Sequence, residues 1–287
     1  MSDISSRAPR PKIGVLIVAY NAASTLPAVL DQFTPAVLSL IDEIFIFDDA
    51  SVDDTYAVAQ AYPRAEVSQK LKVFRNARNL GYGGNQKAGY DYALTHGFDY
   101  VVLMHGDGQH DPRVIADLVA PILRGTAATV FGSRMMRPRD ALRGGMPLYK
   151  FIGNKILTWF ENRMLGTHMS EFHSGYRVYQ CASLAKIPYR LNADGFHFDS
   201  EIIVQHHALG MPILEVPIPT IYANEICRVN GLLYCLNIIR MVVAYKLHLR
   251  GLIYRSRFDL TRAALPPPSS PHTTSPHPPS SASPETP

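Results

Sequence analysis

The segment at 101–112, VVLMHGDGQHDP, constrains the fold of this 287-residue chain more than any other part of it. Its first four residues are apolar, as in a buried strand, and its last two, Asp-Pro, are typical of the start of a helix. Between them lies Asp107, flanked by glycines that let a ligand approach the backbone. Ligands of open α/β sheets bind beyond the carboxyl ends of the parallel strands. Asp107 beside Gln109 therefore predicts a site for Mg²⁺ or Mn²⁺ that holds phosphate groups.

Apolar runs alternate with segments of helical spacing over the first half of the chain. The expected strands are 13–20, 43–47, 71–74, 100–104 and 129–131, and the expected helices are 24–40, 53–62, 85–96 and 112–124. After them we expect helices at 147–165 and 199–209, strands at 171–179 and 213–216, and a basic amphipathic helix or helix pair at 229–257. This alternation predicts an α/β fold with a mostly parallel sheet flanked by helices.

The composition favours one globular domain with appendages. We expect a disordered N-terminus at 1–11, a globular domain at 12–225, a basic amphipathic helical extension at 226–260 and a disordered Pro/Ser-rich tail at 261–287. The net charge of +4 is too small to indicate nucleic-acid binding. The three cysteines lack metal-binding spacing and are typical of reduced thiols in a cytosolic protein. Because no run of 18 uncharged apolar residues occurs, we expect no transmembrane helix.

Polar side chains follow several of the predicted strands at their carboxyl ends. Asp48 and Asp49 follow the second strand, Asp107 and Gln109 the fourth, and Arg134 the fifth. Because these ends meet at one edge of a doubly wound sheet, the side chains should surround one crevice. One carboxylate can accept hydrogen bonds from a base or ribose, another can hold a divalent metal, and the planar guanidinium can clamp a diphosphate. The pattern therefore predicts a nucleotide-diphosphate site.

Seven short pieces of sequence carry a family resemblance. In chain order they are AYN at 19–21, DDASVDDT at 48–55, NLG at 79–81, HGDGQHDP at 105–112, GSR at 132–134, HSGYR at 173–177 and GFHFDSE at 195–201. On these pieces, which span roughly 12–225, the chain resembles the family 2 glycosyltransferases with the Rossmann-like GT-A fold. Within that family it is similar to the dolichol- and polyprenol-phosphate mannose and glucose synthases.

The resemblance implies a role for each matching residue. Asp49 would bind the base or ribose, Asp107 and Gln109 would coordinate the metal, and Arg134 would contact phosphate. The full set implied for the nucleotide-sugar donor is Tyr20, Asn21, Asp48, Asp49, Gly81, Asp107 and Arg134. The set implied for the acceptor phosphate is Arg143, Lys150 and Arg177, and the residues expected to be catalytic are Asp107, Arg134, Arg177 and Asp199.

Two positions depart from the pattern of the family. His105 stands where the metal motif often has a first acid, and Ala22 where an acid usually follows the Tyr-Asn piece. If His105 is a ligand, its neutral imidazole favours Mn²⁺ over Mg²⁺, and the alternative is a histidine packed behind the ligands. Arg177 likewise has the alternative role of a structural ion pair with Glu171, which occupies a position where relatives often have Asp.

The acceptor decides which groups the chemistry needs. A lipid phosphate is an anion near pH 7, because its second pKa is about 6, and it needs cations to position it more than a base to activate it. A hydroxyl acceptor needs a general base, for which Asp199 and Glu201 are the candidates. We therefore expect a metal-dependent inverting enzyme that transfers a sugar from a nucleotide-diphosphate sugar to a polyprenyl phosphate. The alternatives are transfer to a glycan hydroxyl and a nucleotide-sugar-binding protein without catalysis.

The segment at 229–257 bears on where the protein acts. Apolar residues at helical spacing beside a basic side are typical of a helix in a membrane interface, and the alternative is packing on the domain or a second subunit. We expect a cytoplasmic protein, with peripheral attachment to the cytoplasmic face of the membrane as one option, and no nucleic-acid partner. An NAD-dependent dehydrogenase is disfavoured because the glycines at 81–84 lack the dinucleotide fingerprint. The sequence does not indicate the oligomeric state.

Overall fold

A computed structural model describes residues 10–222 and 230–261 of the chain. The segments predicted to be disordered, 1–11 and 261–287, fall outside these ranges except at 10, 11 and 261. The predicted boundary between 225 and 226 also falls outside the described residues. The structure therefore bears on the globular domain and on most of the predicted helical extension.

Within the described residues, seven strands form one sheet in the order β3-β2-β1-β4-β6-β5-β7. The strands are β1 (Ile13–Ala19), β2 (Glu43–Asp48), β3 (Leu71–Arg75), β4 (Tyr100–His105), β5 (Thr129–Ser133), β6 (Arg177–Gln180) and β7 (Ile213–Pro217). β6 runs antiparallel to both of its neighbours, and the other pairs are parallel. The predicted mostly parallel sheet is confirmed.

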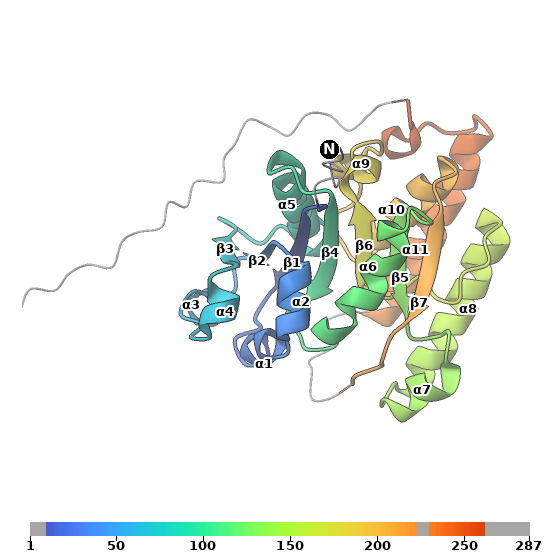
Figure 1. The fold of residues 1–287 in the computed structure, drawn as a ribbon. Helices are drawn as coiled ribbons and strands as arrows, with labels where there is room; N and C mark the ends of the chain where they lie inside the picture. The colour runs from blue at the N-terminus through green and yellow to red at the C-terminus, as the bar shows by residue number, and fades with distance from the viewer. Residues whose placement is uncertain (1–9, 223–229, 262–287) are drawn as a thin grey trace, which may run out of the picture.

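Different helices cover the two faces of the sheet (Figure 1). Side chains of β1 alternate, so that Val15 and Ile17 pack on one face while Leu16 and Val18 pack on the other. The first face is covered by α1 (Leu26–Asp31), α2 (Pro35–Leu40), α3 (Thr55–Gln60), α4 (Ala65–Ser68) and α6 (Ile115–Leu123). The second face is covered by α5 (Tyr82–Thr95), α8 (Leu148–Leu165), α9 (Cys181–Leu184), α10 (Phe198–Ala208) and α11 (Gly231–Leu249). This burial on both faces explains why the central strands are continuously apolar.

The strand register aligns the carboxyl ends of the strands that precede the predicted site. β1 pairs with β2 so that Ala19 lies beside Asp48, and with β4 so that Val18 lies beside His105. β5 runs in the same direction and ends at Ser133. The loops that carry the predicted donor and metal residues therefore leave the sheet at the same edge.

Two predicted elements differ from the observed ones because of local hydrogen bonding. The predicted helix at 24–40 is two helices, since Thr34 starts α2 by accepting a hydrogen bond from the Val37 N–H (3.3 Å), with Pro35 at the first position. The predicted strand at 171–179 is limited to β6, because backbone carbonyl groups at 172 and 174 bind the side chain of Arg177 instead. A further short helix, α7 (Pro138–Arg143), lies between the predicted strand at 129–131 and the predicted helix at 147–165.

α11 confirms a helix in the predicted segment at 229–257, although it ends at Leu249. Gly251, in the left-handed region (φ 69°), turns the chain into the short helix η3 (Ser256–Phe258), whose Phe258 packs on Tyr245 of α11. By length and composition alone, α11 is a candidate membrane span with a mean hydropathy of 1.4. α11 includes Arg240 and Lys246, and the expectation of no transmembrane helix stays a prediction.

Glycines in α5 and α8 lead to opposite expectations for substitution by alanine. A Cβ at Gly83 would lie 2.4 Å from the carbonyl oxygen of Ala193, so Gly83→Ala should destabilise the protein by about 2 kcal/mol. A Cβ at Gly153 would meet nothing within 4 Å, so Gly153→Ala should stabilise α8 by about 0.5–1 kcal/mol. Urea unfolding followed by circular dichroism measures both changes. Equal effects of the two substitutions would contradict the packing of α5 against residue 193.

Candidate active site

Asp49 lies at the carboxyl end of β2, against the glycine-rich turn that begins α5. Its carboxylate accepts hydrogen bonds from the backbone N–H groups of Leu80 (2.7 Å) and Gly81 (3.0 Å) and from Asn76 Nδ2 (2.9 Å). Gly81 is in the left-handed region (φ 80°), and a Cβ there would lie 2.7 Å from the carbonyl oxygen of Asp194. Burial raises the pKa of Asp49, although the donors act to lower it. Two residues predicted for the donor site, Asp49 and Gly81, are thus in direct contact.

The other donor residues predicted near β1 and β2 differ in accessibility. Asp48 is fully buried, accepts hydrogen bonds from within the loop at 48–55 and pairs with Arg75 (3.4 Å). Asn21 accepts a hydrogen bond from a backbone N–H of the same loop (2.9 Å). Both side chains shape this loop. The Asp48 carboxylate has no exposed surface, and its predicted contact with the donor stays a prediction. Tyr20, by contrast, is 38% exposed.

Asp107 and Gln109 lie in the turn after β4, where the metal site is predicted. The Asp107 side chain is 41% exposed, its Oδ1 accepts a hydrogen bond from the Gln109 N–H (3.0 Å), and its Oδ2 lies 3.8 Å from His105 Nδ1. Burial acts to raise the pKa of Asp107, but the groups around it, the Gln109 N–H among them, lower it below its usual range, so an anionic oxygen ligand is available. Among the described residues, no three His, Cys, Asp or Glu side chains form a metal cluster. A metal here would therefore also use the Gln109 amide or phosphate oxygens.

Tyr82, in the first turn of α5, connects the interior of the domain to the turn of Asp107 and Gln109, which we call the metal corner because the metal site is predicted there. Its hydroxyl oxygen lies 2.9 Å from His105 Nε2 and 2.8 Å from Asp199 Oδ2. Burial and the charge of Asp199 raise the pKa of Tyr82 well above its usual value, so the group stays a hydroxyl. This role of Tyr82 could not be inferred from the sequence, because the residue lies inside a glycine-rich piece that indicates only a tight turn. Its aromatic side chain between glycines is the signal that was available.

Arg134 follows β5 and is held by Glu171. Its Nε donates to Glu171 Oε1 (3.1 Å), its backbone N–H donates to Oε2 (2.8 Å), and Nη2 pairs with the same carboxylate. Burial would lower the pKa of Arg134 and raise that of Glu171, but their mutual attraction reverses both shifts. Nη1 lies 3.3 Å from the Tyr222 hydroxyl, and the Lys150 ammonium lies 4.8 Å from the centroid of the Tyr222 ring. Two predicted phosphate-binding cations therefore meet at Tyr222.

Arg177 is completely buried, and its predicted contact with an acceptor phosphate stays a prediction. Its guanidinium donates to three backbone carbonyl oxygens at 2.8–2.9 Å and lies 3.6 Å from the Asp199 carboxylate. Asp199 raises the pKa of Arg177 against the opposite effect of burial. The alternative prediction, an ion pair with Glu171, is wrong, because Glu171 pairs with Arg134. Arg177 is thus a structural cation behind the site.

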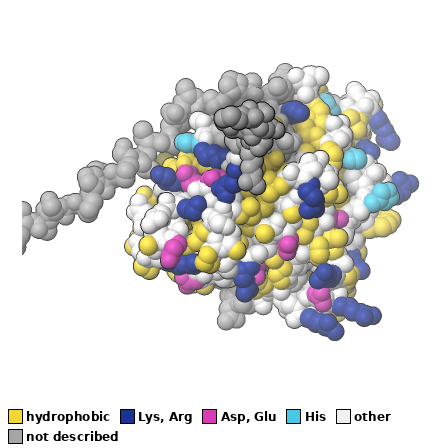
Figure 2. Space-filling model, viewed as in Figure 1, with side chains coloured by type: hydrophobic (Ala, Val, Ile, Leu, Met, Phe, Trp, Pro, Cys, Tyr) yellow, Lys and Arg dark blue, Asp and Glu magenta, His cyan; other side chains and the backbone are white. Residues whose placement is uncertain are grey.

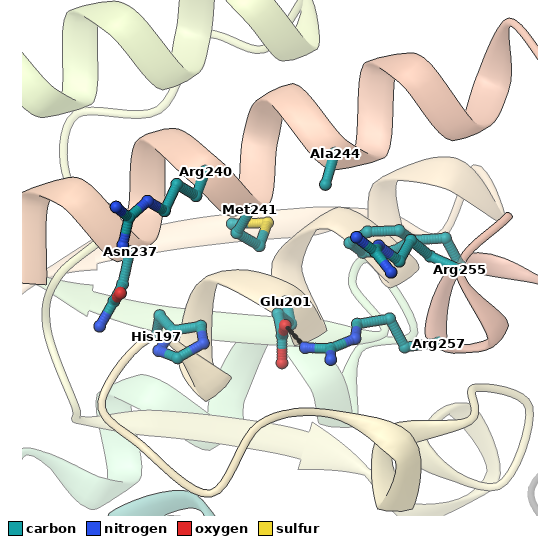
Figure 3. A pocket seen from close by; sticks show the side chains of 9 residues that line it. His197, Glu201, Asn237, Arg240, Met241, Ala244, Arg255 and Arg257 are labelled. Atoms are coloured by element: carbon teal, nitrogen blue, oxygen red, sulfur yellow. Dashed lines mark hydrogen bonds and ion pairs between the residues drawn. The ribbon is translucent and has the colours of Figure 1, made fainter. Parts of the chain in front are cut away.

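Asp199 and Glu201, the candidates for a general base, are both buried at the start of α10. Asp199 accepts hydrogen bonds from Tyr82 (2.8 Å) and Gln86 (3.1 Å) on α5. Glu201 accepts one from a backbone N–H (2.7 Å) and pairs with Arg257, beside a pocket of about 240 Å³ between α10 and α11 (Figure 3). Both carboxylates are therefore hydrogen-bonded and ion-paired within the protein.

Arg143 ends α7 and its side chain is largely exposed, with Asp140 at 3.7 Å. The next residue, Gly144, accepts a backbone hydrogen bond from Tyr222 (3.1 Å). α7 therefore contacts the segment that carries Tyr222, and it also contacts α8, the helix that carries Lys150. Arg143 is thus on a helix that contacts the one carrying Lys150, and its side chain is in open solvent.

Comparison with known proteins agrees with this geometry. The sequence matches the profile of glycosyl transferase family 2 over residues 14–187, more than half of the chain. A UDP-N-acetylglucosamine–dolichyl-phosphate N-acetylglucosaminyltransferase from Methanococcus voltae is 29% identical over 222 residues, covering 74% of this chain and 86% of the relative. An undecaprenyl-phosphate mannosyltransferase from Micrococcus luteus is 29% identical over 212 residues, covering 72% of this chain and 82% of the relative.

Solved structures resemble the fold. Mannosyl-3-phosphoglycerate synthase from Rubrobacter xylanophilus has a TM-score of 0.63 at 17% identity, over 86% of this chain and 77% of that one. Glucosyl-3-phosphoglycerate synthase from Mycobacterium tuberculosis, in complex with Mn²⁺, UDP and phosphoglyceric acid, has a TM-score of 0.61 at 23% identity, over 86% and 80%. These likenesses establish the GT-A fold and confirm the predicted fold class. With the family profile matched over its catalytic core, this chain belongs to glycosyl transferase family 2.

Proposed function

We propose that this glycosyltransferase moves a sugar from a nucleotide-diphosphate sugar to a polyprenyl phosphate, with a divalent metal ion and with inversion at the anomeric carbon. The relatives support the acceptor class, because one is named for transfer to dolichyl phosphate and another for transfer to undecaprenyl phosphate. The structural neighbour described with UDP and Mn²⁺ supports the donor class and the metal.

The proposal rests on the hydrogen bonds and ion pairs of the two carboxylates at the start of α10, Asp199 and Glu201. Asp199 is engaged by Arg177, Tyr82 and Gln86, and Glu201 is engaged by Arg257 and a backbone N–H. A hydroxyl acceptor must lose a proton, whereas a phosphate oxygen is already anionic near pH 7. The arrangement therefore favours an acceptor that supplies its own negative charge.

The reaction joins an oxygen of the acceptor phosphate to the anomeric carbon while the bond from that carbon to the leaving diphosphate breaks on the opposite face. Asp107 and Gln109 would hold the metal, whose charge stabilises the diphosphate as it leaves. Arg134 supplies a second positive charge, which Glu171 and Tyr222 already fix in place. A group fixed in advance needs little reorganisation during the reaction, so its charge acts fully on the developing anion.

Basic side chains around Tyr222 suit the acceptor phosphate. Arg134 and Lys150 both contact Tyr222, and Arg143 follows on α7. Figure 2 shows Lys and Arg side chains gathered over α7 on the face in view. Cations at this position can hold a phosphate monoester without neutralising the carboxylates of the donor site, which lie across the strand ends.

An exposed apolar surface lies on the helices beside these cations. It is formed by Leu148, Tyr149, Ile152, Ile156 and Trp159 of α8 and by Leu232, Leu233, Leu236, Ile239 and Val243 of α11. The two helices contact each other, so their apolar stripes are neighbours. An apolar stripe with Lys150 and Arg240 at its side has the composition of a surface that lies in the headgroup region of an anionic membrane. This composition supports peripheral attachment to a membrane, and a lipid-linked acceptor resides in that membrane.

Transfer of labelled sugar into an organic extract tests the proposed activity. Purified protein with Mn²⁺, undecaprenyl phosphate and labelled UDP- or GDP-sugars should produce lipid-linked sugar. Asp107→Ala should reduce the rate at least about 100-fold, because it removes a carboxylate that would hold the metal at the leaving diphosphate. Asp117→Ala, which changes an exposed acid on α6, is the matched control and should stay within about twofold.

Glu201→Gln addresses the hydroxyl-acceptor alternative directly. The substitution keeps the shape of the side chain, so transfer should persist instead of falling by the roughly 100-fold or more that loss of a general base costs. Loss of transfer in Glu201→Gln with an intact fold, or no extractable sugar with any donor, would contradict the lipid-phosphate acceptor.

Trp159, the one tryptophan of the chain, reports on membrane contact because it lies on α8 and is 67% exposed. Vesicles that contain phosphatidylglycerol should shift its emission to shorter wavelength. Ile156→Glu should weaken vesicle binding at least about tenfold, because burial of one such side chain contributes about 1.5–3 kcal/mol. Leu123→Glu, at an exposed position of α6, is the control. An unchanged emission spectrum with vesicles would count against attachment through α8.

A further inference from the structure

A chain of four side chains leads from the interior to the metal corner. Arg177 Nη2 lies 3.6 Å from Asp199 Oδ2, which lies 2.8 Å from the Tyr82 hydroxyl. That hydroxyl lies 2.9 Å from His105 Nε2, and His105 Nδ1 on the other side of the ring lies 3.8 Å from Asp107 Oδ2. The direction of each hydrogen bond in this chain fixes the next one.

The direction of the hydrogen bonds is set first at Asp199. Its carboxylate, paired with the buried Arg177, has no proton to donate and can only accept hydrogen bonds. The single hydroxyl hydrogen of Tyr82 therefore goes to Asp199, since two oxygens at 2.8 Å without a hydrogen between them would repel. The Tyr82 oxygen is then an acceptor, and His105 Nε2 must carry a hydrogen to donate to it. In the neutral ring this leaves the lone pair on Nδ1, the nitrogen that faces Asp107.

We propose that Tyr82 and Asp199 hold His105 as the tautomer with its hydrogen on Nε2, so that Nδ1 is a third protein ligand for the metal beside Asp107 and Gln109. The proposal deepens the proposed function and rests on its use of a divalent metal. Tyr82 and Asp199 are positioning residues in this account, and Asp199 thereby has a role other than general base.

The spacing of the two facing atoms agrees with this assignment. A distance of 3.8 Å between His105 Nδ1 and Asp107 Oδ2 is too long for a hydrogen bond. Two ligand atoms that each lie about 2.1 Å from one ion are at most roughly 4.2 Å apart, so the separation is within reach of a shared metal. Histidine ligands generally donate their other N–H to a fixed acceptor, and here Tyr82 is that acceptor.

The backbone around the ring leaves His105 little freedom. A Cβ at Gly175 would lie 2.5 Å from His105 Nε2, so a glycine at this position is what allows the contact with Tyr82. On the other side, the His105 backbone N–H donates to His110 Nδ1 (3.1 Å), and the His110 ring stacks on Tyr176 at 4.8 Å.

Pulsed electron paramagnetic resonance of bound Mn²⁺ tests the ligation without measuring activity. The protein with Mn²⁺ and UDP should show modulation from a directly bonded ¹⁴N nucleus. His105→Asp should still bind Mn²⁺, through a carboxylate, but without that modulation. It should also raise the affinity for Mg²⁺ relative to Mn²⁺, because a carboxylate suits the harder ion better than an imidazole does.

Metal affinity tests the positioning role. Tyr82→Phe should weaken Mn²⁺ binding in the presence of UDP about tenfold, the usual effect of losing the partner of a metal-bound histidine. Tyr92→Phe is the matched control, since Tyr92 also lies on α5 and also donates to a carboxylate, Glu43 (2.6 Å), but away from the site. In the His105→Asp background, Tyr82→Phe should no longer change Mn²⁺ affinity, because the histidine that it positions is gone.

Bound Mn²⁺ without ¹⁴N modulation in the unsubstituted protein would overturn this inference and leave the proposed function standing. So would equal Mn²⁺ affinities for Tyr82→Phe and Tyr92→Phe. Failure of the unsubstituted, folded protein to bind Mn²⁺ with UDP would overturn both the inference and the metal dependence of the proposed function. Melting temperatures of all variants confirm that each comparison is made between folded proteins.

Discussion

The buried guanidinium of Arg177 is the interaction on which the arrangement of the site depends. A charge without exposed surface is costly unless it is paired and hydrogen-bonded, and here three carbonyl groups, the Asp199 carboxylate and the face of Phe131 (4.5 Å) surround it. These partners belong to β5, the loop before β6 and the start of α10. Because they must all meet at one cation, the ends of these elements are fixed relative to one another.

The ion pair of Arg177 with Asp199 also fixes the side of the site that α5 forms. Asp199 is held by Arg177 and in turn holds Tyr82 and Gln86 of α5, which begins at the turn that binds Asp49. The donor side and the metal corner are thereby connected through one buried carboxylate. Arg134 and Glu171 form a second pair closer to the surface, where Tyr222 and Lys150 extend it towards α8. The buried pair Arg177–Asp199 therefore positions the neighbouring side chains, and the outer pair Arg134–Glu171 presents a positive charge to the site.

Most of the sheet could be predicted, because a buried parallel strand has an apolar run that periodicity reveals, and β1, β2 and β4 all have one. The edge at which Asp49, Asp107 and Arg134 gather follows from the same alternation. Sequence could not show that Arg177 points inward, because an arginine in a motif looks the same whether it binds a ligand or an internal carboxylate. It also could not assign Glu171 to Arg134, which lies 37 residues away. Such pairings depend on tertiary packing that no local pattern encodes.

In the proposed reaction the acceptor phosphate supplies its own negative charge, and the enzyme supplies no general base. The most direct measurement compares polyprenyl phosphate with the corresponding polyprenol, at equal concentration and over a range of pH. We expect sugar transfer to the phosphate and none to the alcohol, with kcat/KM rising through about pH 6 as the phosphate loses its second proton and staying constant above that. Transfer to the alcohol at a comparable rate would contradict the account.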